Sequence, residues 1–263
     1  MSDGNASLTP DRLTLIRAFR TLQPAIVALD GPAGSGKSTV GYRLAQDVDF
    51  LFFDTGVMYR AVTWAALEHA VDTHDEIVVS ELAKQIQIDV TPPEPEDREH
   101  RQNSVFVDGR NVTPFIRTPR VEQHVSIVSA YLVVRQALSD QQRRISKYYG
   151  TGQAEKAGVV MAGRDIGTVV VPEAPLKIYL DASAQERARR RYTELVAQGK
   201  AVEFAAILEG ILQRDQLDSQ RAVSPLHPAE DAIIIDTSAL SPDAVVMEIL
   251  RSAYRIMHTE VRQ

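Results

Sequence analysis

Five short apolar runs of strand length recur along the chain, at residues 25–29, 50–53, 158–161, 176–180 and 232–235. Their hydrophobicity is continuous rather than alternating, which is typical of parallel strands covered on both faces. Helical patterns follow or separate these runs, at about 38–47, 57–69, 120–145, 184–198, 205–217 and 242–257. Strands that alternate with helices predict an α/β fold with a parallel core sheet flanked by helices.

The alternation of strands and helices is interrupted in the middle of the chain. Residues 77–119 contain a short apolar run at 104–107 that is followed by a turn sequence, Asp108-Gly109. This pattern predicts a small inserted unit with antiparallel strands. The polar segment 147–156 is expected to be a loop.

Composition narrows the possible functions. The 263 residues are 44% hydrophobic and 24% charged, as in ordinary globular proteins. The absence of cysteine excludes disulfides, cysteine zinc sites and a thiol nucleophile. The formal net charge of −6 provides no overall basic field for duplex nucleic acid. Any bound anion must therefore be held by a local cluster of donors, and we expect no nucleic-acid partner.

The N-terminal sequence and the hydropathy of the chain indicate its location in the cell. Residues 1–24 form a polar leader with a weak amphipathic stretch around Leu15 and Phe19, and they lack the apolar segment of a signal peptide. No segment approaches the roughly 20 apolar residues that are needed to cross a bilayer. We therefore expect a cytoplasmic protein without a membrane partner. Separately, we expect a monomer.

A glycine-rich segment connects the first apolar run to the first predicted helix. Its sequence, Gly31-Pro-Ala-Gly-Ser-Gly-Lys-Ser38, matches the phosphate-loop pattern G-x-x-x-x-G-K-[ST] in full. Glycines let successive backbone N–H groups converge on an anion, and the following helix adds its unpaired amides. Lys37 supplies a charge for the β- and γ-phosphates, and Ser38 offers a hydroxyl ligand to Mg²⁺. The loop predicts nucleotide binding, but GTPases, motors and small-molecule kinases all share it.

Arginines are predicted to gather near the same edge of the sheet. Arg60 follows the second apolar run and Arg164 follows the third, and residues just past the ends of parallel strands face the ligand crevice. Taken singly, each arginine is more simply explained as part of a solvated helix face. Together they are the cations that phosphoryl transfer between two anionic substrates requires. Two predicted helices each place further charged residues on one face: Arg187, Arg190 and Arg191 on the first, and Arg214, Asp218 and Arg221 on the second.

Five motifs stand out: Asp30-Gly-Pro-Ala-Gly-Ser-Gly-Lys-Ser-Thr39, Asp54-Thr-Gly-Val-Met-Tyr-Arg60, Ile116-Arg-Thr118, Gly163-Arg-Asp-Ile-Gly-Thr-Val169 and Arg221-Ala-Val-Ser-Pro-Leu226. Together, over about residues 25–251, they resemble the bacterial cytidylate (CMP) kinases of the nucleoside monophosphate (NMP) kinase family. The resemblance implies transfer of the γ-phosphate of ATP to CMP or dCMP with Mg²⁺, giving CDP or dCDP in pyrimidine metabolism. It also implies a P-loop core at 25–76 and 157–263, a lid at about 185–200 and an inserted NMP-binding domain at 77–156. The leader, residues 1–24, lies outside the resemblance.

The resemblance also implies site residues. ATP binding falls on Gly31, Pro32, Ala33, Gly34, Ser35, Gly36, Lys37, Ser38 and Thr39. CMP binding falls on Thr55, Arg60, Ser126, Arg135, Arg164, Asp165, Arg214, Asp218 and Arg221. Of these, Ser126, Arg135 and Asp165 would read cytosine, Arg60, Arg164 and Arg221 would hold the α-phosphate, and Arg214 with Asp218 would lie near the ribose. Lys37 and the lid arginines Arg187, Arg190 and Arg191 would be catalytic.

The chemistry of cytosine agrees with these base contacts. Arg135 can donate to the ring nitrogen and carbonyl, and Asp165 can accept from the exocyclic amine. Uracil would present a carbonyl to the aspartate, so lone-pair repulsion would disfavour UMP. A simpler interpretation is that Ser126 and Arg135, nine residues apart, are ordinary positions on one helix face.

One position departs from the family. An acidic residue often precedes Gly163 in these kinases, where it can support the waters of Mg²⁺, but this chain has Ala162. Either Asp30, Asp54 or Asp165 takes that role, or metal support is weaker. Two other functions remain open, namely a P-loop kinase for another monophosphate such as UMP or dTMP, and a nucleotide-sensing module.

Overall fold

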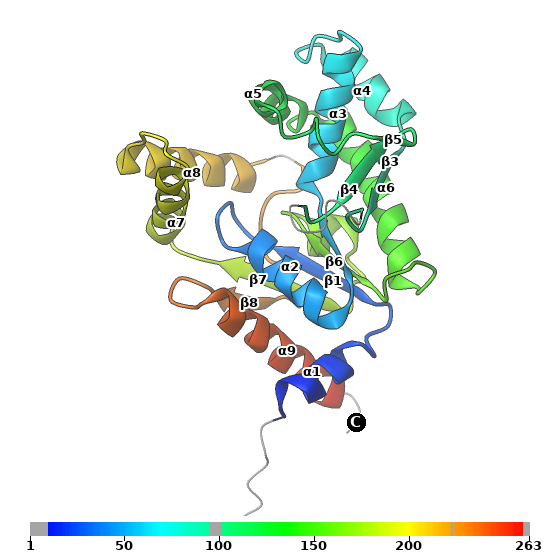
Figure 1. The fold of residues 1–263 in the computed structure, drawn as a ribbon, viewed down its shortest axis with the longest axis vertical. Helices are drawn as coiled ribbons and strands as arrows, with labels where there is room; N and C mark the ends of the chain where they lie inside the picture. Colours follow the sequence, from blue (N-terminus) through cyan, green and yellow to red (C-terminus); the bar gives the residue numbers. More distant parts are fainter. Residues whose placement is uncertain (1–9, 95–100, 222, 260–263) are drawn as a thin grey trace, which may run out of the picture.

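The computed structural model describes residues 10–94, 101–221 and 223–259, which form two sheets with helices around them (Figure 1). The larger sheet has five strands, all parallel, in the order β2-β6-β1-β7-β8. Each strand lies within one residue of a predicted run, so the predicted parallel core sheet flanked by helices is confirmed. The strands are β1 (Ile26–Asp30), β2 (Leu51–Asp54), β6 (Val159–Ala162), β7 (Leu176–Asp181) and β8 (Ile233–Asp236).

The central strand β1 shows why the apolar runs are continuous. All five of its residues are buried, and successive side chains point to opposite faces. Val27 and Leu29 pack in one core with helices α1, α2 and α9, whereas Ile26 and Ala28 pack in the other core with α3 and α6. These helices are α1 (Arg12–Phe19), α2 (Lys37–Val48), α3 (Gly56–Glu68), α6 (Leu132–Gly150) and α9 (Pro242–Thr259).

The smaller sheet is antiparallel, as the sequence predicts for this region. It is formed by β3 (Ile88–Thr91), β4 (Ser104–Val107) and β5 (Arg110–Asn111), and the predicted turn joins β4 to β5. Helix α4 (Glu76–Gln85) was not expected. It is capped by Asp75, whose side chain accepts from the amide of Val78. The boundaries of the inserted domain stay a prediction.

The single helix predicted over 120–145 is wrong, because the segment forms two helices. Helix α5 (Pro119–Val128) ends before a short turn, and α6 begins at Leu132. No glycine or proline marks the break in the sequence. Tertiary contact accompanies it instead, since the Tyr131 hydroxyl in the turn donates to the carbonyl of Thr73 at 2.9 Å.

The loop predicted over 147–156 is also wrong in its first part. Helix α6 continues to Gly150, because its end packs against the core. Tyr149 is buried, and a Cβ atom on Gly150 would lie 2.4 Å from Ile26 Cγ1. Packing on β1 therefore carries the helix into a segment whose polar composition indicates a loop.

The described part of the predicted leader belongs to the core. Leu15 and Phe19 of α1 are fully buried, and the Phe19 ring packs against Phe50 with the ring centroids 6.0 Å apart. The Arg20 side chain donates to the carbonyl of Val48 at 3.0 Å. Helix α1 thus closes one end of the helical layer that also holds α2 and α9 (Figure 1).

Two further helices form an arm beside the sheet, opposite α3 to α5 (Figure 1). They are α7 (Ala184–Ala197) and α8 (Phe204–Ser219), which pack on each other. A five-residue π-helical turn, η2 (Ile166–Val170), follows β6 and packs near β1. Among the described helices, none is long and apolar enough to cross a membrane.

Candidate active site

The phosphate loop lies between β1 and α2, as predicted. Gly31 and Gly36 have φ of +144° and +97°, a region that favours glycine. At Gly31 the constraint is also steric, since a Cβ atom there would lie 2.0 Å from the carbonyl oxygen of Leu180. These backbone conformations wrap the loop around the start of α2, where unpaired amides favour an anion.

Lys37 folds back into its own loop. Its Nζ atom donates to the carbonyls of Gly31 and Pro32, each at 2.7 Å, and the residue is 7% exposed. Burial, with Arg164 close by, lowers the pKa of Lys37 well below its usual value. An arriving phosphate group would supply the negative charge that this ammonium lacks in the free loop.

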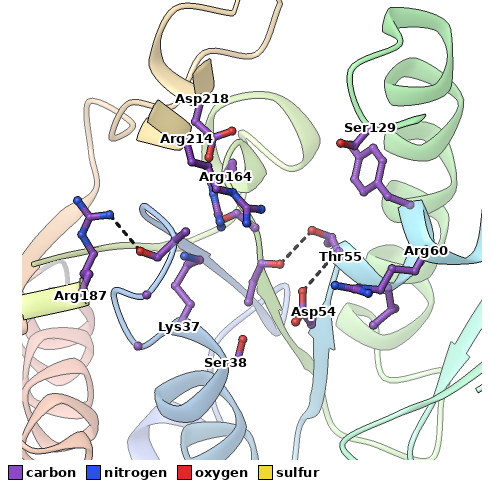
Figure 2. Close-up of a pocket in the computed structure, with 18 of the residues that line it drawn as sticks. Lys37, Ser38, Asp54, Thr55, Arg60, Ser129, Arg164, Arg187, Arg214 and Asp218 are labelled. Atoms are coloured by element: carbon purple, nitrogen blue, oxygen red, sulfur yellow. Dashed lines mark hydrogen bonds and ion pairs between the residues drawn. The ribbon is translucent and has the colours of Figure 1, made fainter. Parts of the chain in front are cut away.

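A cavity of about 650 Å³, here called the main cavity, opens beside the loop (Figure 2). Ten Lys and Arg side chains and four carboxylates line it, although the chain as a whole has a net charge of −6. The local cluster of cations expected from the sequence is therefore present. Predicted site residues on its wall are Ala33, Gly34, Gly36, Lys37, Ser38, Thr39, Thr55, Arg60, Arg135, Arg164, Asp165, Arg187, Arg190, Arg191, Arg214, Asp218 and Arg221.

Four predicted residues do not line the main cavity. Three of them belong to the phosphate loop itself: the carbonyls of Gly31 and Pro32 accept from Lys37, and Ser35 lines a second cavity. Ser126 is exposed on α5, and Ser129, one turn further on, lines the cavity instead. The role of Ser126 in reading the base stays a prediction.

One end of the main cavity holds a buried ion pair. Arg135 Nη2 lies 2.7 Å from Asp165 Oδ2, and both side chains are at most 10% exposed. The guanidinium lies over the ring of Tyr59, 5.7 Å from its centroid. Arg135 Nε is buried and has no hydrogen-bond partner among the described residues. This pair offers donors and an acceptor side by side, as recognition of a nucleobase edge requires.

A second cluster joins residues after β6 to residues on and just after α8. Arg164 Nε donates to Asp218 Oδ2 at 3.1 Å, and Arg221 Nη2 lies 3.5 Å from the other oxygen of the same carboxylate. Arg214 lies beside them (Figure 2). One aspartate among three arginines leaves positive charge for an anion such as a phosphate.

The three predicted lid arginines line the main cavity but are paired within the protein. Arg187 makes a two-point ion pair with Asp215 on α8 and also donates to the Ala33 carbonyl in the loop at 3.1 Å. Arg190 binds Glu186 and the carbonyl of Thr237. Arg191 lies 2.7 Å from Glu194. Their contact with a transferring phosphoryl group stays a prediction.

Arg60 is also paired in this structure. It lies 2.7 Å from Glu122 of α5, on the opposite wall from the loop. The lining residues that were not selected as site residues from the sequence include Arg117, Tyr59 and Ser129. The first two belong to the quoted motifs, so the motifs already carried a signal for them, whereas nothing in the sequence marks Ser129.

The carboxylates can be compared as supports for a metal ion. Both oxygens of Asp30 accept backbone amides, and Asp165 is paired with Arg135. Asp54 lines the main cavity with Ser38, and within the described part of the chain only its Oδ1 has a hydrogen-bond partner, the amide of Gly56 at 3.0 Å (Figure 2). The described residues contain no cluster of three or more His, Cys, Asp or Glu suited to a metal. One hydroxyl and one carboxylate fit a hard cation that takes its other ligands from phosphates and water.

A second cavity of about 420 Å³ lies on the other side of the loop. It shares Gly36, Thr39 and Arg190 with the main cavity. Its remaining wall comes mainly from the segment 237–242, after β8, and from the start of α7. A ligand held by the phosphate loop can therefore extend into either cavity.

Comparison with known proteins gives consistent matches. Residues 27–255 match the family model described as cytidylate kinase. The chain is 47% identical to the cytidylate kinase of Desulforamulus reducens, over 85% of this chain and 94% of that protein. It is 48% identical to that of Limosilactobacillus reuteri, over 85% and 92%. It is 46% identical to the bifunctional pantoate ligase/cytidylate kinase of Synechococcus elongatus, over 92% of this chain and 46% of that protein.

A solved structure of a small-molecule kinase resembles the chain distantly. Shikimate kinase from Bacteroides thetaiotaomicron has a TM-score of 0.43 at 11% identity, covering 89% of this chain and 98% of that one. A similarity this low bears on neither substrate nor mechanism.

Proposed function

This chain belongs to the cytidylate kinase family, and from that premise we propose that it transfers the γ-phosphoryl group of ATP to CMP or dCMP, giving CDP or dCDP. The observation that carries the proposal is the main cavity, where the phosphate loop and the Arg135–Asp165 pair meet in one space. Two nucleotides repel each other through their phosphates. Ten cationic side chains around one cavity offset that repulsion.

The acceptor nucleotide would lie between α3, α6 and η2. Arg135 and Asp165 would bind the cytosine edge, because they provide a donor and an acceptor that are already fixed by each other. Arg60, Arg164 and Arg221 would bind its α-phosphate, and Arg214 with Asp218 would lie at the ribose. Asp218 is already bound to Arg164 and Arg221, which fixes its orientation.

The donor nucleotide would bind through the phosphate loop. Its β- and γ-phosphates would draw the Lys37 ammonium away from the carbonyls of Gly31 and Pro32. The nucleoside of ATP would extend into the second cavity, on the opposite side of the loop from the acceptor. This arrangement directs the γ-phosphate toward the main cavity.

Direct in-line transfer needs no covalent enzyme intermediate. Lys37 and the lid arginines would bind the oxygens of the transferring group. For this, Arg187, Arg190 and Arg191 would break their present contacts with carboxylates and backbone carbonyls and form contacts with phosphate oxygens as α7 and α8 close over the site. Closure would also exclude water, which otherwise accepts the phosphoryl group.

We further propose Mg²⁺ as the divalent cation, held by the Ser38 hydroxyl and, through water, by Asp54. When bound, it neutralises charge on the β- and γ-phosphate oxygens. Asp54 is the candidate that remains for the role left open by Ala162, since Asp30 and Asp165 are engaged elsewhere.

The proposal is tested by ADP release from Mg-ATP with CMP, dCMP, UMP or AMP as acceptor. We expect ADP to form with CMP and dCMP and to form much more slowly with UMP and AMP. Equal rates with UMP would favour a broader monophosphate kinase. No ADP with any acceptor, despite tight ATP binding, would indicate a nucleotide-sensing module.

Assembly and location stay predictions. We expect a monomer in the cytoplasm, without a nucleic-acid or membrane partner. Sedimentation of the full chain with and without nucleotides tests the oligomeric state.

A further inference from the structure

Asp30 is a buried carboxylate to which the proposed mechanism gives no role. It is the last residue of β1, it is 5% exposed, and it does not line the main cavity. Its two oxygens accept from two successive amides 136 and 137 residues away. Oδ1 accepts from Ile166 N at 2.9 Å, and Oδ2 accepts from Gly167 N at 2.8 Å.

The position of these contacts connects the two substrate sites. Asp30 directly precedes the phosphate loop, and Ile166 directly follows Arg164 and Asp165, which would bind the acceptor. Backbone pairing between β1 and β6 ends at Leu29, before this turn. Beyond that point, the Asp30 side chain continues the connection between β1 and the residues after β6.

We propose that Asp30 is a positioning residue that fixes the acceptor-binding turn, residues 164–167, relative to the phosphate loop. The inference rests on the proposed kinase function. In this role Asp30 touches neither nucleotide. It sets the place of Asp165 and Arg164 with respect to the γ-phosphate, because the turn that carries them is bound to the residue from which the loop departs.

The chemistry of the contact favours an aspartate. A carboxylate accepts at both oxygens, whereas asparagine would present an NH₂ group to one of the two amides. The turn also approaches closely, since a Cβ atom on Gly167 would lie 3.4 Å from Asp30 Oδ2 and 3.2 Å from Lys177 Cδ. Burial raises the pKa of Asp30 to about 6 although both amides lower it, so the ionised form carries a folding cost. A carboxylate needed only for packing has no reason to carry that cost.

The test compares Asp30→Asn with wild type in the full chain. We expect the KM for CMP to rise about tenfold and the preference for CMP over UMP to fall, while the KM for ATP changes less than about twofold. The matched control is Asp181→Asn. Asp181 ends the neighbouring strand β7, but its carboxylate accepts from the amide of the next residue, Ala182, so all constants should stay at wild-type values.

Hydrogen exchange gives a readout that does not depend on turnover or on the variant folding. In the free wild-type enzyme, the amides of Ile166 and Gly167 should exchange slowly, and unprotected rates there would overturn the proposal. In a folded Asp30→Asn protein, both amides should exchange at least about tenfold faster.

Two kinetic outcomes would also overturn it. Unchanged constants would show that the turn is held by other contacts, and equal increases in both KM values would show a general structural defect. A wild-type enzyme that is inactive toward CMP would instead count against the proposed function. The activity of the wild type is therefore measured first, before any variant is compared with it.

Discussion

Replacing Phe19 by alanine tests whether α1 is part of the core or an appended leader. The family model begins at residue 27, so α1 lies outside the matched range. Phe19 is 0% exposed and its ring packs against Phe50. Large-to-small changes at such positions cost about 3–5 kcal/mol, against a total of roughly 5–15 kcal/mol for a typical domain. We expect Phe19→Ala to lower the free energy of unfolding by about 4 kcal/mol.

Urea denaturation measures this effect, with the m-value as a check that the two-state transition is preserved. Leu13→Ala is the matched control, because Leu13 is on the same helix but 65% exposed, and its change should stay below about 0.5 kcal/mol. The kinetic constants of folded Phe19→Ala should equal wild type, since α1 precedes the start of β1 and none of its residues lines the main cavity, which lies beyond the end of that strand. A loss below about 1 kcal/mol for Phe19→Ala would refute the packing of α1.

Three further predictions concern the site. Lys37→Ala should reduce kcat by about 10²-fold or more with an unchanged circular dichroism spectrum, because the transferring group loses a preorganised cation; normal turnover would contradict the mechanism. Asp165→Asn should raise the rate with UMP relative to CMP by about tenfold, since the lone-pair repulsion toward the uracil carbonyl is relieved; an unchanged ratio in a folded protein would remove its base-reading role. Asp30 has its pKa raised from 3.8 to about 6, so the native state holds its proton more tightly than the unfolded chain. The contribution of Asp30 to the free energy of unfolding should therefore fall by about 3 kcal/mol as pH rises from about 3 to 7. The difference between wild type and Asp30→Asn in urea titrations at several pH values should show this fall, and a constant difference would count against it.

Much of the core was predictable because one physical rule dominates there. A parallel strand with both faces covered must be apolar at every position, and β1 is buried at all five. The phosphate loop was predictable because its glycines are required by backbone geometry, as at Gly31. The meeting of Arg164 with Arg60 around one cavity follows from the rule that parallel strands end at the same edge.

The features that were missed depend on distant contacts. The break between α5 and α6 has no helix-breaking residue and is accompanied by the Tyr131 contact with Thr73. The end of α6 depends on how Gly150 packs on Ile26. The partners of the lid arginines could not be predicted either, because Asp215 lies on another helix, 28 residues away from Arg187. Motif spacing identifies which side chains reach a site. It does not identify the protein groups that those side chains contact when no ligand is bound.

The concentration of cations inside the main cavity leaves the remainder of the molecule more acidic than the chain as a whole. A phosphate-bearing ligand near the mouth of the cavity is attracted over roughly 8–10 Å, about one Debye length at physiological ionic strength. The charge distribution thus concentrates small anions at the phosphate loop while the protein keeps a net negative charge.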